Sequence, residues 1–187
     1  MFTDPVQNVL EFGFLPGQSV ADLGSGAGHY AMAISKAVGE KGLVYAIDLQ
    51  QDLLIRIMKE AEEDGRSNIR IIRGDIQKPK GTVLGDSVVD GAVFSNILFQ
   101  LEDKAGALGE AFRILKPGGK VGVVEWSDLS FLAGVKGDGQ KKVINEEEAK
   151  ELFSKSGFAF ERSFDAGEHH YGLVFKKPNS AIPQFKV

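Results

Sequence analysis

The chain contains no cysteine, which excludes disulfide bonds, thiolate metal ligands and cysteine nucleophiles. It also lacks any apolar run of membrane-spanning length, and its N-terminus has no basic segment followed by an apolar one. We therefore expect neither a membrane span nor a signal peptide, and a cytoplasmic location follows by default. No excess of basic charge is present, since the net charge is −4 with acids and bases interleaved, which argues against a general nucleic-acid-binding surface.

The length and composition that remain are those of one globular domain. With 187 residues, of which 43% are hydrophobic and 26% charged, the chain is long enough to bury a core. It has no internal repeat, no low-complexity block and no linker. We therefore expect a single domain over residues 1–178 that begins with a short helix, followed by a loose C-terminal tail over residues 179–187.

Strands alternate with helices along most of the chain, which predicts an α/β fold with a mostly parallel sheet covered on both faces. The last two strands are joined only by residues 166–168, too few for a crossover helix, so they should form an antiparallel hairpin. The expected elements are a helix at 5–12, strands at 19–23, 43–47, 68–73, 88–94 and 120–126, helices at 30–38, 53–65, 104–115 and 146–156, and terminal strands at 158–165 and 169–176.

A glycine-rich turn joins the first expected strand to the helix after it. The strand ends in Asp22-Leu23, and Gly24, Gly26 and Gly28 follow before helical residues resume. Glycine permits the tight turn and leaves no Cβ in the way of a ligand, while the helix start presents free N–H groups. The turn therefore predicts that a ligand lies directly against the backbone here.

Polar side chains stand where the expected strands end. Ligands of an open α/β sheet bind beyond the carboxyl ends of its strands, so these side chains should converge on one crevice. Asp48 lies about 20 residues after the last glycine, where a carboxylate accepts hydrogen bonds from both ribose hydroxyls; the alternative is a plain strand-end cap. Asp75-Ile76 would meet an adenine edge and face, or Asp75 simply forms a turn after Gly74. The full set is Asp22, Asp48, Asp75, Ser95, Asn96, Glu125, Trp126 and Ser127.

Two other nucleotide-binding patterns fit the glycine turn poorly. The dinucleotide fingerprint requires a third small residue that lets helix and strand pack closely, and His29 occupies that position. A phosphate-binding loop requires Lys followed by Ser or Thr after the glycines, and neither follows here.

The ordered motifs resemble those of class I S-adenosylmethionine (SAM)-dependent methyltransferases. Within that family, the chain is most similar to the small-molecule group that includes quinone-biosynthesis C-methyltransferases. The resemblance covers almost the whole chain, in order and at matching spacing. It rests on residues 21–28, 45–48, 73–76, 90–96 and 115–120, which read ADLGSGAG, YAID, RGDI, DGAVFSN and LKPGGK.

This resemblance implies a Rossmann-like three-layer sandwich of seven strands in the order 3-2-1-4-5-7-6, with strand seven antiparallel. It also implies SAM as the cofactor and S-adenosylhomocysteine (SAH) as its product. For the methionine part of SAM, the implied contacts are Gly24, Gly26 and Gly28, with Asp22 at its amino group and Ser95 and Asn96 at the methionine part and the methyl group. For the rest of SAM, they are Asp48 with the ribose, Leu49 with the adenine face, and Asp75 and Ile76 with the adenine. Ser25 and Tyr30 are further implied contacts.

The sequence departs from that family's pattern in three ways. Only about 18 residues precede the first strand and nothing bulky follows the fifth, so the substrate pocket is expected to be open or completed by a partner chain, as in a homodimer. Ser95-Asn96-Ile97-Leu98 replaces the Asn-Pro-Pro-Tyr-type motif of amino-group methyltransferases, which argues against DNA bases and protein glutamine as acceptors. Without cysteine, arsenite methylation is not expected.

No single side chain stands out as a catalytic base. The sulfonium of SAM already activates the methyl group, so a base is needed only if the acceptor must lose a proton. The candidates are His29, whose alternative is a helix-start residue over the cofactor loop, and Glu125. Because neighbours on a strand point to opposite faces, either Glu125 or Trp126 should face the pocket.

The other polar residues have structural interpretations. We expect His169 and His170 to be structural or surface residues. Lys136, Lys141 and Lys142 belong to a solvated loop, although they would also attract an anionic substrate. No set of acidic or histidine residues has metal-ligand spacing, so no metal is expected.

The sequence therefore predicts in-line transfer of a methyl group from SAM to a small-molecule acceptor. Two rival hypotheses remain. One is an NAD-dependent oxidoreductase on the same architecture, and the other is a protein that binds SAM or a nucleotide without catalysing transfer. The sequence does not identify the acceptor, because the segments expected to form its pocket are the least distinctive ones.

Overall fold

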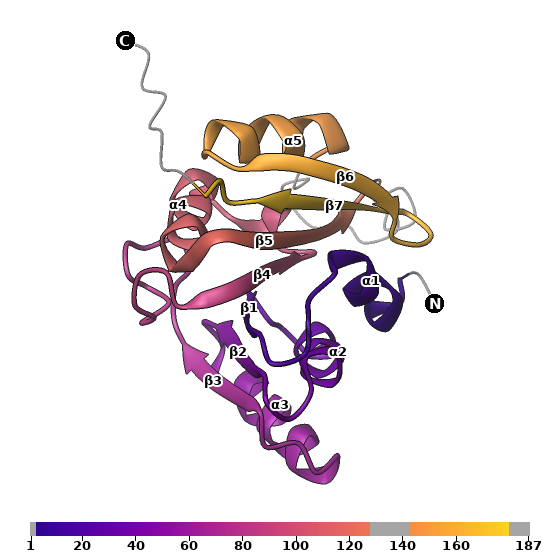
Figure 1. The fold of residues 1–187 in the computed structure, drawn as a ribbon, viewed down its shortest axis with the longest axis vertical. Helices are drawn as coiled ribbons and strands as arrows, with labels where there is room; N and C mark the ends of the chain where they lie inside the picture. The colour runs from indigo at the N-terminus through magenta and orange to yellow at the C-terminus, as the bar shows by residue number, and fades with distance from the viewer. Residues whose placement is uncertain (1–2, 128–142, 180–187) are drawn as a thin grey trace, which may run out of the picture.

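The computed structural model describes residues 3–127 and 143–179, so Lys136, Lys141, Lys142 and most of the expected tail lie outside the described residues. Within these ranges, strands form one sheet in the order β3-β2-β1-β4-β5-β7-β6 (Figure 1). Neighbours from β3 to β5 are parallel, and β7 runs antiparallel to both β5 and β6. The predicted fold class, strand order and terminal hairpin are confirmed.

Strands and helices alternate along the chain up to β5, except that β3 is followed by β4 with no helix between them. The strands are β1 (Ser19–Leu23), β2 (Leu43–Asp48), β3 (Ile69–Arg73), β4 (Val89–Ser95), β5 (Leu115–Trp126), β6 (Ala159–Asp165) and β7 (His170–Lys176). The helices are α1 (Pro5–Phe12), α2 (His29–Val38), α3 (Gln51–Glu63), the short 3-10 helix η1 (Leu98–Gln100), α4 (Lys104–Ile114) and α5 (Glu146–Lys155).

Helix ends coincide with capping residues that the sequence displays. The Asp4 carboxylate accepts hydrogen bonds from backbone N–H groups at the start of α1, and Gly13 ends that helix in the left-handed conformation. Asn145 and Glu148 form a reciprocal capping box at the start of α5. These local signals explain why the predicted bounds of both helices agree closely with the structure.

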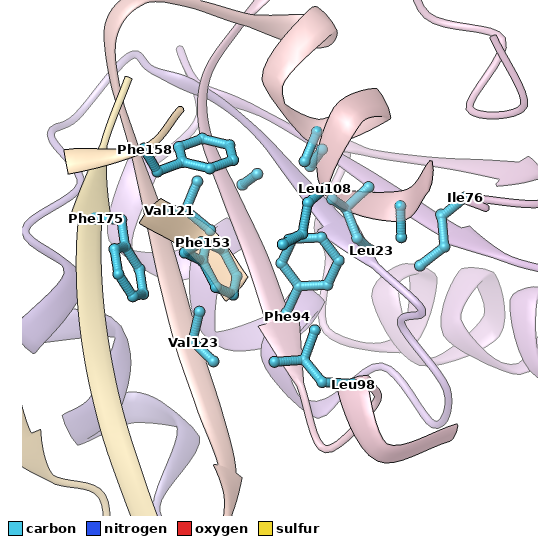
Figure 2. Packing of buried hydrophobic residues seen from close by; sticks show 14 of the residues in the cluster. Leu23, Ile76, Phe94, Leu98, Leu108, Val121, Val123, Phe153, Phe158 and Phe175 are labelled. Carbon is cyan, nitrogen blue, oxygen red and sulfur yellow. The ribbon is translucent and has the colours of Figure 1, made fainter. Parts of the chain in front are cut away.

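The helices cover the two faces of the sheet in separate sets. Helices α1, α2 and α3 pack on one face around Phe12, Ile34 and Leu54, whereas α4 and α5 pack on the other around Phe94 and Phe153. Figure 2 shows the second cluster, with Phe175 at one end, Phe153 and Phe94 between, and Ile76 at the other end. Among the described residues, no helix has the length and apolar character needed to cross a bilayer.

Two local expectations are wrong. The segment Lys116–Gly119 was expected to connect the helix at 104–115 to the fifth strand. It lies within β5, where a register shift lets Leu115 pair with Val89 and Lys120 with Gly91. The helix predicted at 104–115 ends one residue earlier, at Ile114, and Leu115 begins this strand. The sequence also did not predict η1, which follows β4 directly and whose residues carry no strong capping signal.

Candidate functional site

A cavity of about 750 Å³ opens at the carboxyl ends of β1, β2, β3 and β4. Its volume lies within the range typical of small-molecule sites. Every residue predicted to contact the cofactor lines it except Gly28, and His29 lines it as well. The predicted residues that line the cavity are Asp22, Gly24, Ser25, Gly26, Tyr30, Asp48, Leu49, Asp75, Ile76, Ser95 and Asn96.

The three glycines of the turn have different roles. All three adopt positive φ, and a Cβ on Gly26 would meet no atom closer than 4.0 Å, so this glycine leaves cavity space open. A Cβ on Gly24 would lie 2.7 Å from the side chain of Ile97, and one on Gly28 would lie 2.5 Å from that of Ile57. Gly28 therefore lets α2 pack against α3, and it is not among the described residues that line the cavity, so its contact with the cofactor stays a prediction.

Asp22 is a buried carboxylate at the floor of the cavity. It is 1% exposed, and within the described residues neither of its oxygens has a hydrogen-bond partner of normal geometry. Burial raises the pKa of Asp22 to about 7; the Ala31 amide opposes this rise, and the nearby Asp48 carboxylate adds to it. An unpaired buried carboxylate is costly, so this position favours a cationic group of a ligand.

Asp48 joins the end of β2 to the glycine turn. Its Oδ2 accepts a hydrogen bond of 2.9 Å from the Gly26 N–H, and its Oδ1 accepts one of 2.9 Å from the Gln50 N–H. Each carboxylate oxygen has a further lone pair, so Asp48 retains capacity to accept hydrogen bonds from ligand hydroxyls. The exposed side chain of Leu49 also lines the cavity and offers an apolar surface beside this carboxylate.

Asp75 and Ile76 lie on a loop that is packed tightly from behind. A Cβ on Gly74 would collide with the carbonyl of Gly81, and a Cβ on Gly81 would collide with the carbonyl of Asp75. Asp75 Oδ1 accepts from the Gln77 N–H at 3.0 Å, while its Oδ2 accepts no hydrogen bond within the described part of the chain. The loop therefore presents a carboxylate oxygen and an apolar side chain to the same cavity.

Glu110 of α4 holds the following part of this loop in place through hydrogen bonds. Its buried carboxylate accepts hydrogen bonds from the Lys80 N–H at 3.0 Å and from the Thr82 hydroxyl at 2.6 Å, and it pairs with Arg113 at 2.7 Å. Burial alone would raise the pKa of Glu110, but the hydrogen bonds from Arg113, Thr82 and Lys80 lower it to about 2.

Tyr30 connects the cavity to α1. Its hydroxyl accepts a hydrogen bond of 2.9 Å from Asn8, a buried amide that also donates to Thr3 Oγ1 at 2.7 Å. The Thr3 hydroxyl in turn donates to the carbonyl of Ala166, in the β6–β7 turn, at 2.7 Å. Thr3, Pro5 and Tyr30 all line the cavity, so two segments distant in sequence form this wall, and the β6–β7 turn supports it through Ala166.

Glu125 and Trp126 do not face the cavity, which corrects the expectation that one of them would. Glu125 is fully buried, and its carboxylate accepts hydrogen bonds from the N–H groups of Leu98 at 2.8 Å and Trp126 at 3.0 Å. Burial raises the pKa of Glu125 to about 7 against the opposing effect of these and neighbouring backbone N–H groups. Trp126 packs against buried His170, with ring centroids 3.9 Å apart and the ring planes tilted by 38°. His29 is therefore the one base candidate from the sequence that lines the cavity.

The charged side chains around the cavity are acidic. Asp22, Asp48 and Asp75 line it, and no lysine or arginine of the described ranges does. A wall of this composition favours ligands that carry positive charge and offer hydroxyl or amino hydrogens.

Several lining residues were missed by the sequence interpretation. They are Thr3, Pro5, Ala27, Ile47, Gln50, Gly74, Gln77, Ile97, Gln100 and Leu101. Some adjoin predicted contacts in sequence and were within reach of the same argument. Thr3, Pro5, Gln100 and Leu101 reach the cavity only because α1 and η1 fold over its edge, and no local pattern indicates this.

Sequence comparison matches residues 7–135 to the ubiE/COQ5 methyltransferase family. A similar curated relative is the ubiquinone/menaquinone biosynthesis C-methyltransferase UbiE of Vibrio vulnificus, which is 34% identical over 120 residues. That match covers 64% of this chain and 45% of the relative, so the chain spans about half the length of the curated relatives it matches.

Similar folds occur among solved structures. A SAM-dependent methyltransferase from Aquifex aeolicus superposes with a TM-score of 0.81 at 28% identity, covering 94% of this chain and 90% of the other. The [4+2]-cyclase SpnF superposes with a TM-score of 0.78 at 17% identity, covering 94% of this chain and 81% of the other. The second likeness shows the fold alone.

Proposed function

This chain belongs to the ubiE/COQ5 methyltransferase family, and from that premise we propose that it transfers a methyl group from SAM to a small-molecule acceptor. The observation that carries the proposal is Asp22, a buried and unpaired carboxylate beside a glycine turn that leaves open space. SAM brings the cationic ammonium and sulfonium groups that such a position favours. The quinone-biosynthesis relatives support an acceptor of modest size that undergoes C-methylation.

The residues around the cavity fit SAM from end to end. Asp22 would pair with the amino group of the methionine part, against the open backbone of Gly26. Asp48 would accept hydrogen bonds from the ribose hydroxyls. Leu49 and Ile76 offer apolar surfaces for the two faces of an adenine, and the second oxygen of Asp75 would accept from the adenine amino group.

The chemistry requires alignment more than acid–base assistance. SAM, when bound, supplies an activated methyl group that an acceptor takes by in-line displacement, leaving SAH. The protein's contribution is to hold the acceptor at attack distance and to exclude water. Ser95, Asn96 and Tyr30 form the wall beside the methionine end, where they would border the methyl group. If the acceptor must lose a proton, His29 is the lining residue able to take it.

We predict that Asp48→Ala weakens SAH binding by about 1–3 kcal/mol, because charge-assisted hydrogen bonds to the ribose are lost. Isothermal titration calorimetry measures this change. Asp64→Ala, which removes an exposed carboxylate outside the cavity, is the matched control and should bind SAH as the unmodified protein does. Equal affinities for the Asp48 variant and the unmodified protein would show that the ribose assignment is wrong.

We also predict that SAH affinity rises with pH until Asp22 is ionised. Because burial raises the pKa of Asp22 to about 7, the carboxyl is protonated below that pH and must release its proton before it pairs with the ligand's ammonium group. The dissociation constant should fall by up to about tenfold per pH unit between about pH 5.5 and 7, then level off.

Two variants test whether the pH dependence of SAH affinity arises from Asp22 and not from a neighbouring side chain. Asp22→Asn should bind weakly at every pH and lose the dependence. His29→Gln replaces a neighbouring side chain of the cavity wall and should retain the dependence. A flat profile for the unmodified protein between about pH 5.5 and 7 would contradict the proposed pairing.

Two experiments separate methyl transfer from the rival functions. SAM or SAH should raise the melting temperature and NAD should not; stabilisation by NAD alone would favour an oxidoreductase. Release of labelled methyl groups from SAM into a metabolite extract then distinguishes an enzyme from a protein that only binds SAM. A homodimer and a cytoplasmic location stay predictions, and light scattering tests the first.

A further inference from the structure

The turn after β4 forms one wall of the cavity but lacks a cap of its own. Asn96, Ile97, Gln100 and Leu101 line the cavity, and η1 lies in the middle of this turn. Ile97 occupies the N-cap position, where its aliphatic side chain makes no capping hydrogen bond. The first N–H groups of such a turn need an acceptor, because buried amides without one are costly.

Glu125 supplies that acceptor from the neighbouring strand. The end of β5 lies beside the end of β4, with Ser95 paired to Val124, so the next residue of β5 lies under the turn. The Leu98 N–H donates to Glu125 Oε2 at 2.8 Å, and the adjacent amides of Ile97 and Phe99 also face this carboxylate. The side chain of Leu98 packs into the core beside Phe94, which fixes the turn from the same direction (Figure 2).

The position of this turn matters to the glycine turn across the cavity. Gly24 packs so closely on Ile97 that a Cβ at Gly24 would lie 2.7 Å from the Ile97 side chain. Asn96, one residue earlier, has a φ of 51°, and its backbone carbonyl accepts a hydrogen bond of 2.9 Å from the Gln100 side chain. A shift of Leu98 would therefore move Ile97 and loosen the support of the glycine turn.

We propose that Glu125 is a positioning residue, whose carboxylate caps the turn at 96–101 and so holds the cavity wall that this turn forms. Through Ile97, Glu125 also holds the glycine turn in its ligand-binding geometry. The proposal rests on the proposed function, because it takes the cavity to be the SAM site. Glu125 touches no ligand in this role, which agrees with its absence from the cavity wall within the described residues.

The test compares SAH binding by calorimetry, well below the unfolding temperature of each variant. Glu125→Ala should raise the dissociation constant about tenfold, because the turn loses a charge-assisted hydrogen bond and only part of that loss reaches the ligand. Glu125→Gln keeps one carbonyl oxygen as an acceptor for the Leu98 N–H and should recover part of the affinity. Hydrogen exchange of the Leu98 amide, followed by NMR, should be faster in both variants.

Asn68→Ala is the matched control for a purely structural role. Asn68 is also buried, and its side chain donates to the carbonyls of Ser35 at 3.1 Å and Gly39 at 2.9 Å, at the amino end of β3 and away from the cavity. Its loss should lower the melting temperature but leave SAH affinity unchanged. An equal loss of affinity in this variant would overturn the proposal, since any destabilisation would then suffice.

The remaining outcomes are also decisive. If Glu125→Ala does not fold, Glu125→Gln decides: unmodified SAH affinity together with unmodified Leu98 exchange overturns the positioning role. If the unmodified protein does not bind SAH, the proposed function fails, whereas normal binding by the unmodified protein and by both folded Glu125 variants refutes only the role of Glu125.

Discussion

Gly26→Val should reduce SAH affinity by at least 100-fold, on the order of 3 kcal/mol, while the protein stays folded. The glycine has a φ of 51°, and a Cβ built on it would have no protein atom closer than 4.0 Å. A valine side chain would therefore project into cavity space that the methionine part of SAM is proposed to occupy. The added strain of a branched residue at positive φ costs about 1–2 kcal/mol of folding stability.

Gly39→Val separates the steric effect from the backbone strain. Gly39 has a φ of 66°, and a Cβ there would also meet nothing within 4 Å, but this glycine ends α2 away from the cavity. Gly39→Val should lose stability in urea denaturation too, because Gly39 has a ψ of −178°, in a region essentially restricted to glycine. Only Gly26→Val should lose SAH binding in calorimetry. Retained affinity in the Gly26 variant would mean that the ligand does not approach this backbone.

Glu110→Ala should lower the free energy of unfolding by about 3 kcal/mol at neutral pH. The substitution leaves Arg113, the Thr82 hydroxyl and the Lys80 N–H without their shared acceptor. Because this network holds the loop behind Asp75, SAH affinity should also fall modestly. Urea denaturation measures the stability change, and a loss below about 1 kcal/mol would show that the network is not a stabilising one.

The difference in unfolding free energy between the unmodified protein and Glu110→Ala should decrease as the pH falls. The pKa of Glu110 is lowered to about 2 in the folded protein from a usual value of 4.5, so its contribution is present above about pH 4.5 and is lost as pH falls toward 2. The unmodified protein and Glu110→Ala should therefore converge in stability across that range. Glu147→Ala removes an exposed carboxylate paired with Lys150 and should change stability by less than about 0.5 kcal/mol at either pH.

Local sequence patterns were sufficient to predict the elements and most of the cofactor side of the cavity. Hydrophobic periodicity and capping residues such as Asp4 and Asn145 act within a few residues, so the bounds of α1 and α5 follow from the chain itself. The parallel topology then places the carboxyl ends of neighbouring strands at one edge. Asp22, Asp48 and Asp75 therefore meet at the cavity, although 26 or more residues separate each from the next.

The long-range contacts of Glu125, Gly28 and Tyr30 could not be predicted in the same way. Glu125 had the residue type and strand-end position of a candidate catalytic base, but it lies beside a turn that no local signal indicated. Gly28 belongs to the same motif as Gly26, but the contact that requires it is with Ile57, on a helix that follows the next strand. Tyr30 likewise depends on Asn8 and on a turn near the end of the chain.

The sequence by itself determined the α/β fold class and the acidic and glycine residues at the strand ends, and its resemblance to a known family implied the strand order. Only the tertiary structure decided which glycine faces open space, which carboxylate is left unpaired, and which one caps a turn. The physical reason is range: propensity, periodicity and capping act between residues close in the chain, whereas burial and packing depend on partners that only the completed fold brings together.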